Sequence, residues 1–343
     1  MRLYEYSIRR LFLLIFVLLG VTVFTFYLSR VVLNPLGAYV TERTRPEAIP
    51  IIEKRLGLDK PFFVQYAIYL EDLVTLNWGW SRVAHMPVIE ALWYRFPATA
   101  ELAIAAFLIT IALGVPLGIL SALKNNKAID HIIRIIALTG ISIPVFWLAL
   151  TLQYSLSYLP KVNGLPSLPS SGRFDPILAQ SYPFTRYTGF VIFDCLIQGN
   201  LVMAADTFIH LILPSITLAF LSVGQITRVA RSSMLEVMRQ DYISTARAYG
   251  LSERVVIYKY ALKNALIPVT TVSGLMFGGL LGGALITETI FAFPGMGQLT
   301  VFAISSNDSY TILAFTVLAS FIYVIINLVV DLLYAKLDPR IRY

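Results

Sequence analysis

Residues 239–268 read RQDYISTARAYGLSERVVIYKYALKNALIP and lie between two long apolar runs of the chain. The stretch is polar and basic, and Gly250 divides it into two parts that each have the spacing of a helix. A membrane protein rarely keeps a long, ordered, charged segment between two spans unless another molecule docks there, since loops held by a rigid scaffold often carry function. We therefore expect the function of this chain to depend on residues 239–268.

The composition of the whole chain indicates a membrane protein. Hydrophobic residues make up 57% of the 343 residues and charged residues 14%, which is too apolar for an ordinary soluble domain of this length. A spanning helix needs about 20 mainly apolar residues. We predict an all-α polytopic membrane protein with six transmembrane helices, at residues 11–28, 99–122, 132–159, 211–229, 269–287 and 311–334.

The distribution of lysine and arginine orients the spans. Segments at the cytoplasmic side of a membrane carry an excess of these residues. With both termini inside, the cytoplasmic segments hold 16 Lys and Arg against 7 Asp and Glu, whereas the external segments hold 11 against 13. We predict a multi-pass protein of the cell (inner, cytoplasmic) membrane with both termini and residues 239–268 in the cytoplasm. The net charge of +7 then needs no nucleic-acid partner.

Three parts follow along the chain. Residues 1–33 are expected to form an N-terminal transmembrane helix, residues 34–96 an external helical cap, and residues 97–343 a core of five transmembrane helices. The core includes an external loop at 160–209 and a cytoplasmic loop at 230–268. Proline and glycine recur through the external loop, which predicts an irregular loop or a small subdomain.

The external cap is expected to contain two short helices. One covers residues 47–56, and an amphipathic second helix starts after Pro61, since proline is tolerated in the first turn of a helix, and runs to Leu76. We expect Trp78 and Trp80 to rest on the spans and so to hold the cap down.

Five glycines lie within the fifth apolar run, three or four residues apart. Small residues at this spacing allow two helix backbones to approach closely in a membrane. Either packing against a neighbouring span of the same chain or a position beside a pore would explain them. The glycines are Gly274, Gly278, Gly279, Gly282 and Gly283.

Catalytic, metal-binding and redox signatures are missing from the sequence. The three histidines are far apart, and Cys195 is the only cysteine, so we expect no metal site and no intrachain disulfide. No H-E-x-x-H or G-x-S-x-G motif is present. We therefore expect a non-catalytic chain with no catalytic residues and no cofactor.

The ionisable residues of the apolar runs lie near the ends of the runs. A carrier driven by protons or ions usually has such a residue near the middle of the membrane, which argues against this class here. A stand-alone secondary transporter or channel remains the alternative function. The residues concerned are Glu101, Asp206, Glu288 and Asp331.

The cytoplasmic loop is predicted to form helix, turn and helix. Asp241 suits an N-cap, because its carboxylate can accept bonds from free amides at the positive end of a helix. Gly250 can end that helix in the left-handed conformation. Ser252 can then cap a second helix over residues 253–264.

The first of these helices is expected to carry a docking surface. Tyr242, Ala246 and Tyr249 recur at helical spacing and would form one stripe, surrounded by small side chains. Small side chains permit a close approach to a socket on another protein. A helix lying on the lipid surface is the alternative, but it prefers bulky apolar residues on the buried face, and these are scarce here.

The sequence DYISTARAYGLS, followed by ALKNALIPV, resembles the signature loop of the inner-membrane permease subunits of ATP-binding-cassette importers, in their dipeptide/oligopeptide branch. The resemblance extends over almost the whole chain. Other segments that resemble the family are RLGLDKP at 55–61, PATAEL at 97–102, GISIP at 140–144, LPSITLA at 213–219, ETIF at 288–291, PGMG at 294–297 and DPRIR at 338–342.

This resemblance implies a type I ABC-importer permease architecture and a subunit that forms the translocation path for dipeptides, oligopeptides or oligosaccharides. The implied partners are a second, related permease subunit, two ATP-binding-cassette ATPase subunits and an external substrate-binding protein, all at a lipid bilayer. ATP and Mg would be bound by the ATPases, since the chain has no G-x-x-x-x-G-K-[ST] loop.

The resemblance also makes the first helix of the loop a coupling helix that receives the motion of the ATPases. Tyr249 stands where the family usually has lysine. Arg247 could present its planar fork to an acidic residue of the ATPase, to a lipid phosphate or to its own loop. The residues assigned to ATPase coupling are Asp241, Tyr242, Thr245, Ala246, Arg247, Ala248, Tyr249, Gly250 and Leu251.

Overall fold

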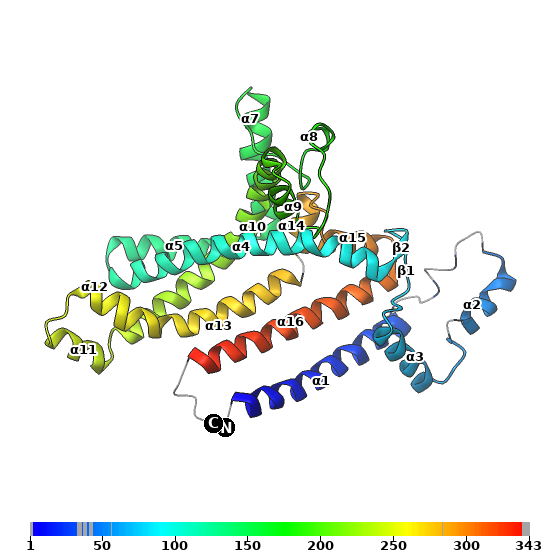
Figure 1. Ribbon diagram of the computed structural model, residues 1–343, viewed down its shortest axis with the longest axis horizontal. Helices are drawn as coiled ribbons and strands as arrows, with labels where there is room; N and C mark the ends of the chain where they lie inside the picture. Colours follow the sequence, from blue (N-terminus) through cyan, green and yellow to red (C-terminus); the bar gives the residue numbers. More distant parts are fainter. Residues whose placement is uncertain are drawn as a thin grey trace.

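The computed structural model describes residues 3–32, 36, 40, 44–55, 57–282 and 284–337. In this part of the chain five helices are long and apolar enough to cross a membrane, and a bent pair of helices gives a sixth if it counts as one span (Figure 1). The five are α1 (Leu3–Tyr27), α4 (Val88–Leu123), α10 (Leu201–Val237), α13 (Leu262–Leu281) and α16 (Ser309–Leu337).

The predicted third span is not one straight helix. Helix α5 (Ala128–Ser142) ends at Ile143, and α6 (Val145–Gln153) starts after Pro144 at an angle of 101°. Proline lacks an amide hydrogen and disfavours helical geometry at the residue before it, and Ile143 is extended, with φ −77 and ψ 126. Beyond α6, the π-helical turn η4 (Tyr154–Tyr158) and α7 (Leu159–Val162) point away from the long helices (Figure 1).

The centre of the fold is the pair α4 and α10, which pack along one another at close range. Glycine makes this approach possible. A Cβ added at Gly118 would lie 2.6 Å from the Cβ of Ala230 and 2.6 Å from the carbonyl oxygen of Thr227. Ile226 and Ala230 fill the space on the α10 side and are almost fully buried. Because α4 has no side chain at Gly118, the two helices approach closely and set the spacing of the rest of the bundle.

Replacing Gly118 with alanine is therefore expected to lower the melting temperature of the detergent-solubilised protein. The extra methyl group forces α4 and α10 apart, and overpacking of this kind costs about 1–3 kcal/mol. Gly20→Ala is the matched control, since a Cβ at Gly20 in α1 would have nothing within 4 Å. Equal melting temperatures for the two variants would contradict the close approach of α4 and α10.

Two of the five glycines in the fifth span pack against α16. A Cβ at Gly278 would lie 3.1 Å from the ring of Tyr323, and one at Gly274 would collide with Val330. These two glycines therefore serve packing within the chain, which was one of the two explanations for the pattern.

The remaining glycines of this run are placed differently. A Cβ at Gly279 would have nothing within 4 Å, and Gly282 is the C-cap residue at which α13 ends. Gly283 lies outside the described residues. A position beside a pore stays a prediction for these residues.

The described residues of the cap form a short 3₁₀ turn, two short α-helices and a small hairpin. These elements are η3 (Pro46–Ala48), α2 (Ile49–Arg55), α3 (Phe62–Val74), β1 (Trp80–Ser81) and β2 (Met86–Pro87), with the two strands antiparallel. They lie at the right-hand end of Figure 1. Helix α4 already starts at Val88, so the predicted end of the cap at residue 96 falls inside a continuous helix and is corrected to residue 87.

Of the two tryptophans expected to rest on the spans, only one does. Trp78 packs against a core cluster that includes Val88 and Leu92, and its Nε1 donates to the carbonyl oxygen of Leu73 at 3.1 Å. Trp80 lies in the hairpin and is 48% exposed. The cap is therefore fixed at one of the two predicted points.

The segment predicted to be an external loop forms a small subdomain, which was one of its two predicted forms, and we name it the external subdomain after that prediction. It contains α8 (Pro176–Ser181) and α9 (Val191–Ile197) and has its own core, where Cys195 and Met203 are fully buried. Phe174 and Phe184 meet edge to face above this core with ring centroids 5.6 Å apart. Two more short helices, α14 (Leu285–Ile290) and α15 (Met296–Ser305), separate α13 from α16.

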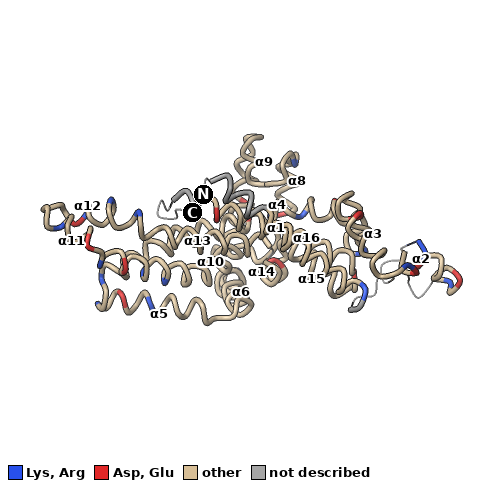
Figure 2. Tube along the Cα trace, turned by 90° about the horizontal axis from the view of Figure 1, so that it is seen from below, with Lys and Arg blue, Asp and Glu red and all other residues tan. Residues whose placement is uncertain are grey.

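Charged residues gather towards the two ends of the long axis of the molecule, around α11 and α5 on one side and around α2 and α3 on the other (Figure 2). The long apolar helices run between these two ends. A region poor in charge between two charged ends is what a membrane-spanning bundle requires.

Candidate functional site

The predicted cytoplasmic loop forms a projection at the end of the molecule opposite the cap (Figure 1). We name residues 241–261 the knob. They form α11 (Asp241–Ala248), a turn, α12 (Glu253–Val255) and the π-helical η5 (Val256–Ala261). The N-cap of α11 is Gln240 and not Asp241, so the predicted cap is wrong by one residue. Asp241 lies in the first turn, where its negative charge still interacts favourably with the positive end of the helix dipole.

The turn of the knob depends on Gly250, as predicted. Gly250 has φ +75, and its amide donates to the carbonyl oxygen of Arg247 at 2.9 Å. The amide of Leu251 reaches back to the carbonyl oxygen of Ala246 at 3.4 Å. These bonds form a Schellman ending, in which the left-handed residue is usually glycine because it has no Cβ to clash.

The second helix of the knob is not a separate element. It starts after Ser252, as predicted, but it does not end at residue 264. The helix continues through η5 into α13, so that residues 253–281 form one unbroken helical segment. The knob is thus attached directly to a membrane span, without a flexible linker.

The inner face of α11 is held by Ile243 and Ala246. Ile243 is fully buried and Ala246 is 6% exposed, and both belong to a core cluster with Met234 of α10 and Val256 of η5. The three residues of the predicted stripe therefore do not share one environment, because Ala246 is buried in this cluster whereas Tyr249 is 82% exposed. Ile243 was missed by the sequence reasoning, although an isoleucine three residues before an alanine in a polar stretch is a recognisable anchor pattern.

The outer face of α11 carries small and polar side chains. Tyr242 is half-buried and its hydroxyl accepts a hydrogen bond from Asn264 at 2.8 Å, while Arg247 pairs with Glu253 of the same knob, Nε to Oε1, at 2.8 Å. Three partners were predicted for Arg247, and the contact with Glu253 corresponds to the one within its own loop. The predicted coupling residues that are exposed are Asp241, Thr245, Arg247, Ala248, Tyr249, Gly250 and Leu251.

The base of the knob is braced by a buried carboxylate. Asp130 of α5 is fully buried, and its carboxylate accepts hydrogen bonds from both Nε and Nη2 of Arg231, each at 2.8 Å. Ser121 of α4 donates to the same carboxylate, and the amide of Asn126 donates to it at 2.9 Å. A charge-assisted, bidentate ion pair of this kind fixes both the distance between the two side chains and their relative orientation. It fastens the turn between α4 and α5 to the part of α10 that leads into the knob.

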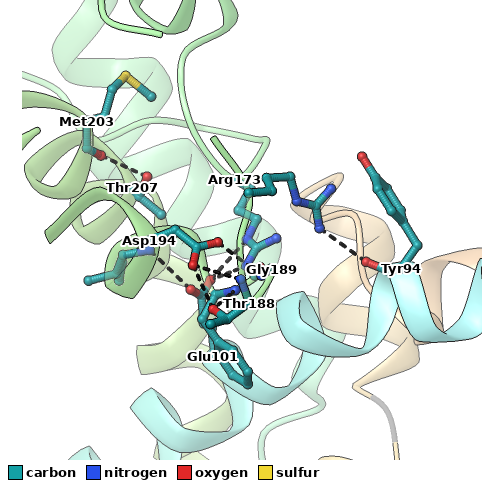
Figure 3. Close-up of polar contacts among 11 residues, drawn as sticks. Tyr94, Glu101, Arg173, Thr188, Gly189, Asp194, Met203 and Thr207 are labelled. Carbon is teal, nitrogen blue, oxygen red and sulfur yellow. Dashed lines mark hydrogen bonds and ion pairs between the residues drawn. The ribbon is translucent and has the colours of Figure 1, made fainter. Parts of the chain in front are cut away.

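A second buried ion pair joins the subdomain to α4 (Figure 3). Arg173 of the external subdomain donates Nε and Nη2 to Oε2 of Glu101 in α4, at 3.0 and 2.6 Å. Its Nη2 also reaches the carbonyl oxygen of Gly189 at 2.7 Å, and the amide of Ile192 donates to Oε1 of Glu101. The two side chains are 4% and 7% exposed, so a buried cation and a buried anion fasten the subdomain to the bundle.

Asp194 organises the subdomain around this pair (Figure 3). Its Oδ1 accepts from the amide and hydroxyl of Thr188, and its Oδ2 accepts from the amide of Gly189 at 3.0 Å. Burial opposes ionisation, but these hydrogen bonds outweigh it and hold the pKa of the Asp194 carboxyl below its usual value. Arg186 lies 4.0 Å above the ring of Tyr94 and adds a contact between subdomain and α4.

A fourth buried carboxylate joins the short helices to α4. Glu288 of α14 is fully buried, accepts from the hydroxyl of Thr99 at 2.9 Å and accepts from the amide of Gln298 at 3.0 Å. Gly295 lies against this carboxylate so closely that a Cβ there would collide with it. Within the described residues, no group of three or more His, Cys, Asp or Glu side chains is placed to hold a metal ion.

Two family descriptions match this chain, and together they cover most of it. Residues 114–343 match the family described as "Binding-protein-dependent transport system inner membrane component". Residues 3–103 match the family described as "Binding-prot-dependent transport system membrane comp, N-term". The first match contains the knob, and the second contains α1, the cap and the first part of α4.

Several curated proteins are similar over nearly their whole length. The dipeptide transport system permease protein DppB of Alkalihalophilus pseudofirmus is 44% identical, over 98% of this chain and 99% of that protein. The probable D,D-dipeptide transport system permease protein DdpB of Escherichia coli is 45% identical, over 96% and 94%. The dipeptide transport system permease protein DppB of Escherichia coli is 38% identical, over 99% of both chains.

A solved structure shares the fold. An inward-facing conformation of the MetNI methionine ABC transporter aligns with a TM-score of 0.52 and 16% identity, over 74% of this chain and 98% of that one. At this level of identity the likeness concerns the fold alone.

Proposed function

The chain belongs to the family of binding-protein-dependent transport system inner membrane components, and from this membership we propose its substrate, its docking site and its partners. It is the membrane-spanning translocation subunit of an ATP-binding-cassette importer. Its helical fold is that of a type I importer permease, which confirms the predicted architecture.

The proposed substrates are dipeptides delivered by an external binding protein. Relatives whose names specify dipeptide transport are 38–45% identical over nearly the full chain, and this single observation carries the proposal. Oligosaccharides, which the sequence left open, have no such support. Longer peptides remain within the same chemical class, because they share the charged termini and the peptide bond.

The proposed docking site for the ATPase is the outer face of α11. Small side chains at Ser244, Thr245 and Ala248 leave the backbone of the helix accessible, while Ile243 holds the helix to the bundle from behind. A rigid helix with an accessible backbone suits a socket on another protein. The continuous segment 253–281 gives a movement of this helix a direct route into the membrane.

The proposed assembly contains a second permease subunit, two ATPase subunits and the binding protein. The chain has no P-loop for phosphate, so ATP and Mg are assigned to the ATPases and the chain itself is assigned no cofactor and no catalytic step. The excess of lysine and arginine around the knob supports a cytoplasmic knob, cytoplasmic termini and an external cap.

The experiment is uptake into vesicles that contain the chain together with its co-purified partners. We expect ATP-dependent accumulation of labelled Ala-Ala that needs the binding protein, and no accumulation of labelled maltotriose. The chain reconstituted alone is the control and should transport neither compound. Full transport by the chain alone would support a stand-alone transporter or channel, and uptake of maltotriose only would overturn the peptide proposal.

A further inference from the structure

A cavity of about 610 Å³ lies at the cap end of the molecule, opposite the knob. It is enclosed by the end of α1, the helix α3 and the first turns of α16, which meet there although they are far apart in the sequence. Its volume falls within the range of about 300–1,000 Å³ that is usual for small-molecule sites. The walls combine one anionic, two cationic and several aromatic side chains, among them Arg30, Asp72, Tyr69, Trp78 and Tyr310.

Arg30 supplies a cation whose hydrogen bonds are incomplete. Its Nε is buried and has no hydrogen-bond partner among the described residues. The guanidinium group lies over the ring of Phe26, 5.6 Å from the centroid. A buried donor without an acceptor is unfavourable, and a guanidinium fork matches the oxygens of a phosphate or carboxylate. An anionic group in the cavity would therefore complete the bonding of Arg30.

Asp72 supplies an anion on the α3 side of the same cavity. Its Oδ1 accepts a hydrogen bond from Asn77 at 3.0 Å, while its Oδ2 has no hydrogen-bond partner in the described part of the chain. Burial raises the pKa of the Asp72 carboxyl, and this effect outweighs the lowering effects of the hydrogen bond from Asn77 and of the positive charge of Arg30 across the cavity. A cation bound in the cavity would stabilise the ionised carboxylate. The cavity thus offers one place for an anion and another for a cation.

The cavity is preformed, because α1 and α3 are locked together beside it. The hydroxyl groups of Thr25 and Tyr69 lie 2.8 Å apart, and those of Thr22 and Tyr66 lie 2.9 Å apart. The ring of Phe26 packs between the rings of the facing tyrosines and is only 2% exposed. A ligand would therefore enter a rigid site and would not have to order its walls.

The position of the cavity selects a membrane lipid. The candidate span in α1 ends at Arg30, and α16 starts at Ser309, so the cavity lies where two spans reach the aqueous boundary. Next to it, α1 exposes an apolar surface in which Val23, Phe24 and Tyr27 are each at least half exposed. Phospholipids place phosphate at this boundary and acyl chains against such a surface, and aromatic side chains favour the same level.

We propose that this cavity binds the head group of a phospholipid of the ethanolamine type, with the phosphate on Arg30 and the ammonium group on Asp72. A free zwitterion, such as a peptide, has the same two charges but makes no use of the apolar surface of α1. The proposal is independent of the docking role of the knob, since the two sites lie at opposite ends.

The test is native mass spectrometry of the full chain, purified with its partner subunits in detergent and titrated with dioleoyl-phosphatidylethanolamine or dioleoyl-phosphatidylglycerol. The wild type is expected to bind the ethanolamine lipid more tightly. Arg30→Gln should weaken its binding by about tenfold, as expected for loss of a charge-assisted contact. Asp72→Asn should abolish the preference between the two lipids while binding itself persists.

Arg45→Gln is the matched control, because Arg45 is an exposed arginine of the same cap that does not line the cavity. Its lipid binding should equal that of the wild type. Equal occupancy by the ethanolamine lipid in wild type, Arg30→Gln and Asp72→Asn would overturn the proposal, and Asp72→Asn decides alone if Arg30→Gln does not assemble. Displacement of the lipid by free Ala-Ala, in a manner that needs Arg30, would assign the cavity to a soluble zwitterion instead.

Discussion

Gly250→Val is expected to lower ATP-driven peptide uptake by at least about tenfold, which corresponds to roughly 1.4 kcal/mol. Gly250 has φ +75, where a residue with a Cβ costs about 1–2 kcal/mol and a β-branched residue more. The turn would open, and α11 would no longer be presented at a fixed angle to the ATPase. The measurement is uptake of labelled Ala-Ala into vesicles, with co-purification of the ATPases measured on the same preparation.

Two variants make this result specific. Gly164 has φ +68 and, like Gly250, open space around its Cα, but it lies in the external loop, so Gly164→Val should leave coupling intact. Gly250→Asn should retain most of the uptake, since asparagine tolerates the left-handed conformation. Normal uptake by Gly250→Val with ATPases bound would contradict the docking role proposed for α11.

Arg173→Met is expected to destabilise the protein by about 3–5 kcal/mol, because it leaves the carboxylate of Glu101 buried without its cation. Glu101 is 7% exposed and has no other cationic partner among its hydrogen bonds in the described residues. The external subdomain should also detach, since Arg173 connects it to α4. Thermal unfolding of the solubilised protein, followed by tryptophan fluorescence, measures the loss.

The double variant Glu101→Gln with Arg173→Met should recover a large part of that stability, because no charge is then left buried alone. Arg186→Met is the control for a lost arginine in the same subdomain. Arg186 stacks on Tyr94 at the surface, a contact worth about 0.5–1 kcal/mol at an exposed site. A melting temperature of Arg173→Met within the range of Arg186→Met would show that the buried pair contributes little.

The features that the sequence predicted correctly have local physical causes. A long apolar run must form a helix in a membrane, because every backbone group needs a partner there. The turn at Gly250 follows from one residue, since glycine is the residue that most readily adopts positive φ at the end of a helix. The knob and five of the six spans could therefore be located from the sequence alone, and the segments resembling a known permease family identified the fold.

The features that were missed have different causes. A hydropathy sum along the sequence does not report the direction of the chain, so it could not predict the 101° bend at Pro144. Glu101 and Arg173 are 72 residues apart and meet only after the subdomain folds. The N-cap of α11 is Gln240 and not Asp241, a difference of one residue that the sequence pattern does not resolve. Tertiary packing decides the meeting of Glu101 and Arg173, whereas Pro144 is a local signal for the bend that hydropathy does not register.

The unbroken helical segment at residues 253–281 has a mechanical consequence. Its 29 residues span about 43 Å at 1.5 Å per residue. A tilt of about 10° at the knob would then displace the far end, at Leu281, by about 8 Å, which exceeds one helical turn of about 5.4 Å. The segment contains the π-helical turn η5 and Pro268, but no loop interrupts it between Glu253 and Leu281. It therefore forms one continuous lever, and if α11 docks as proposed, a small rotation of the knob would be amplified into a larger movement at the far end of the span.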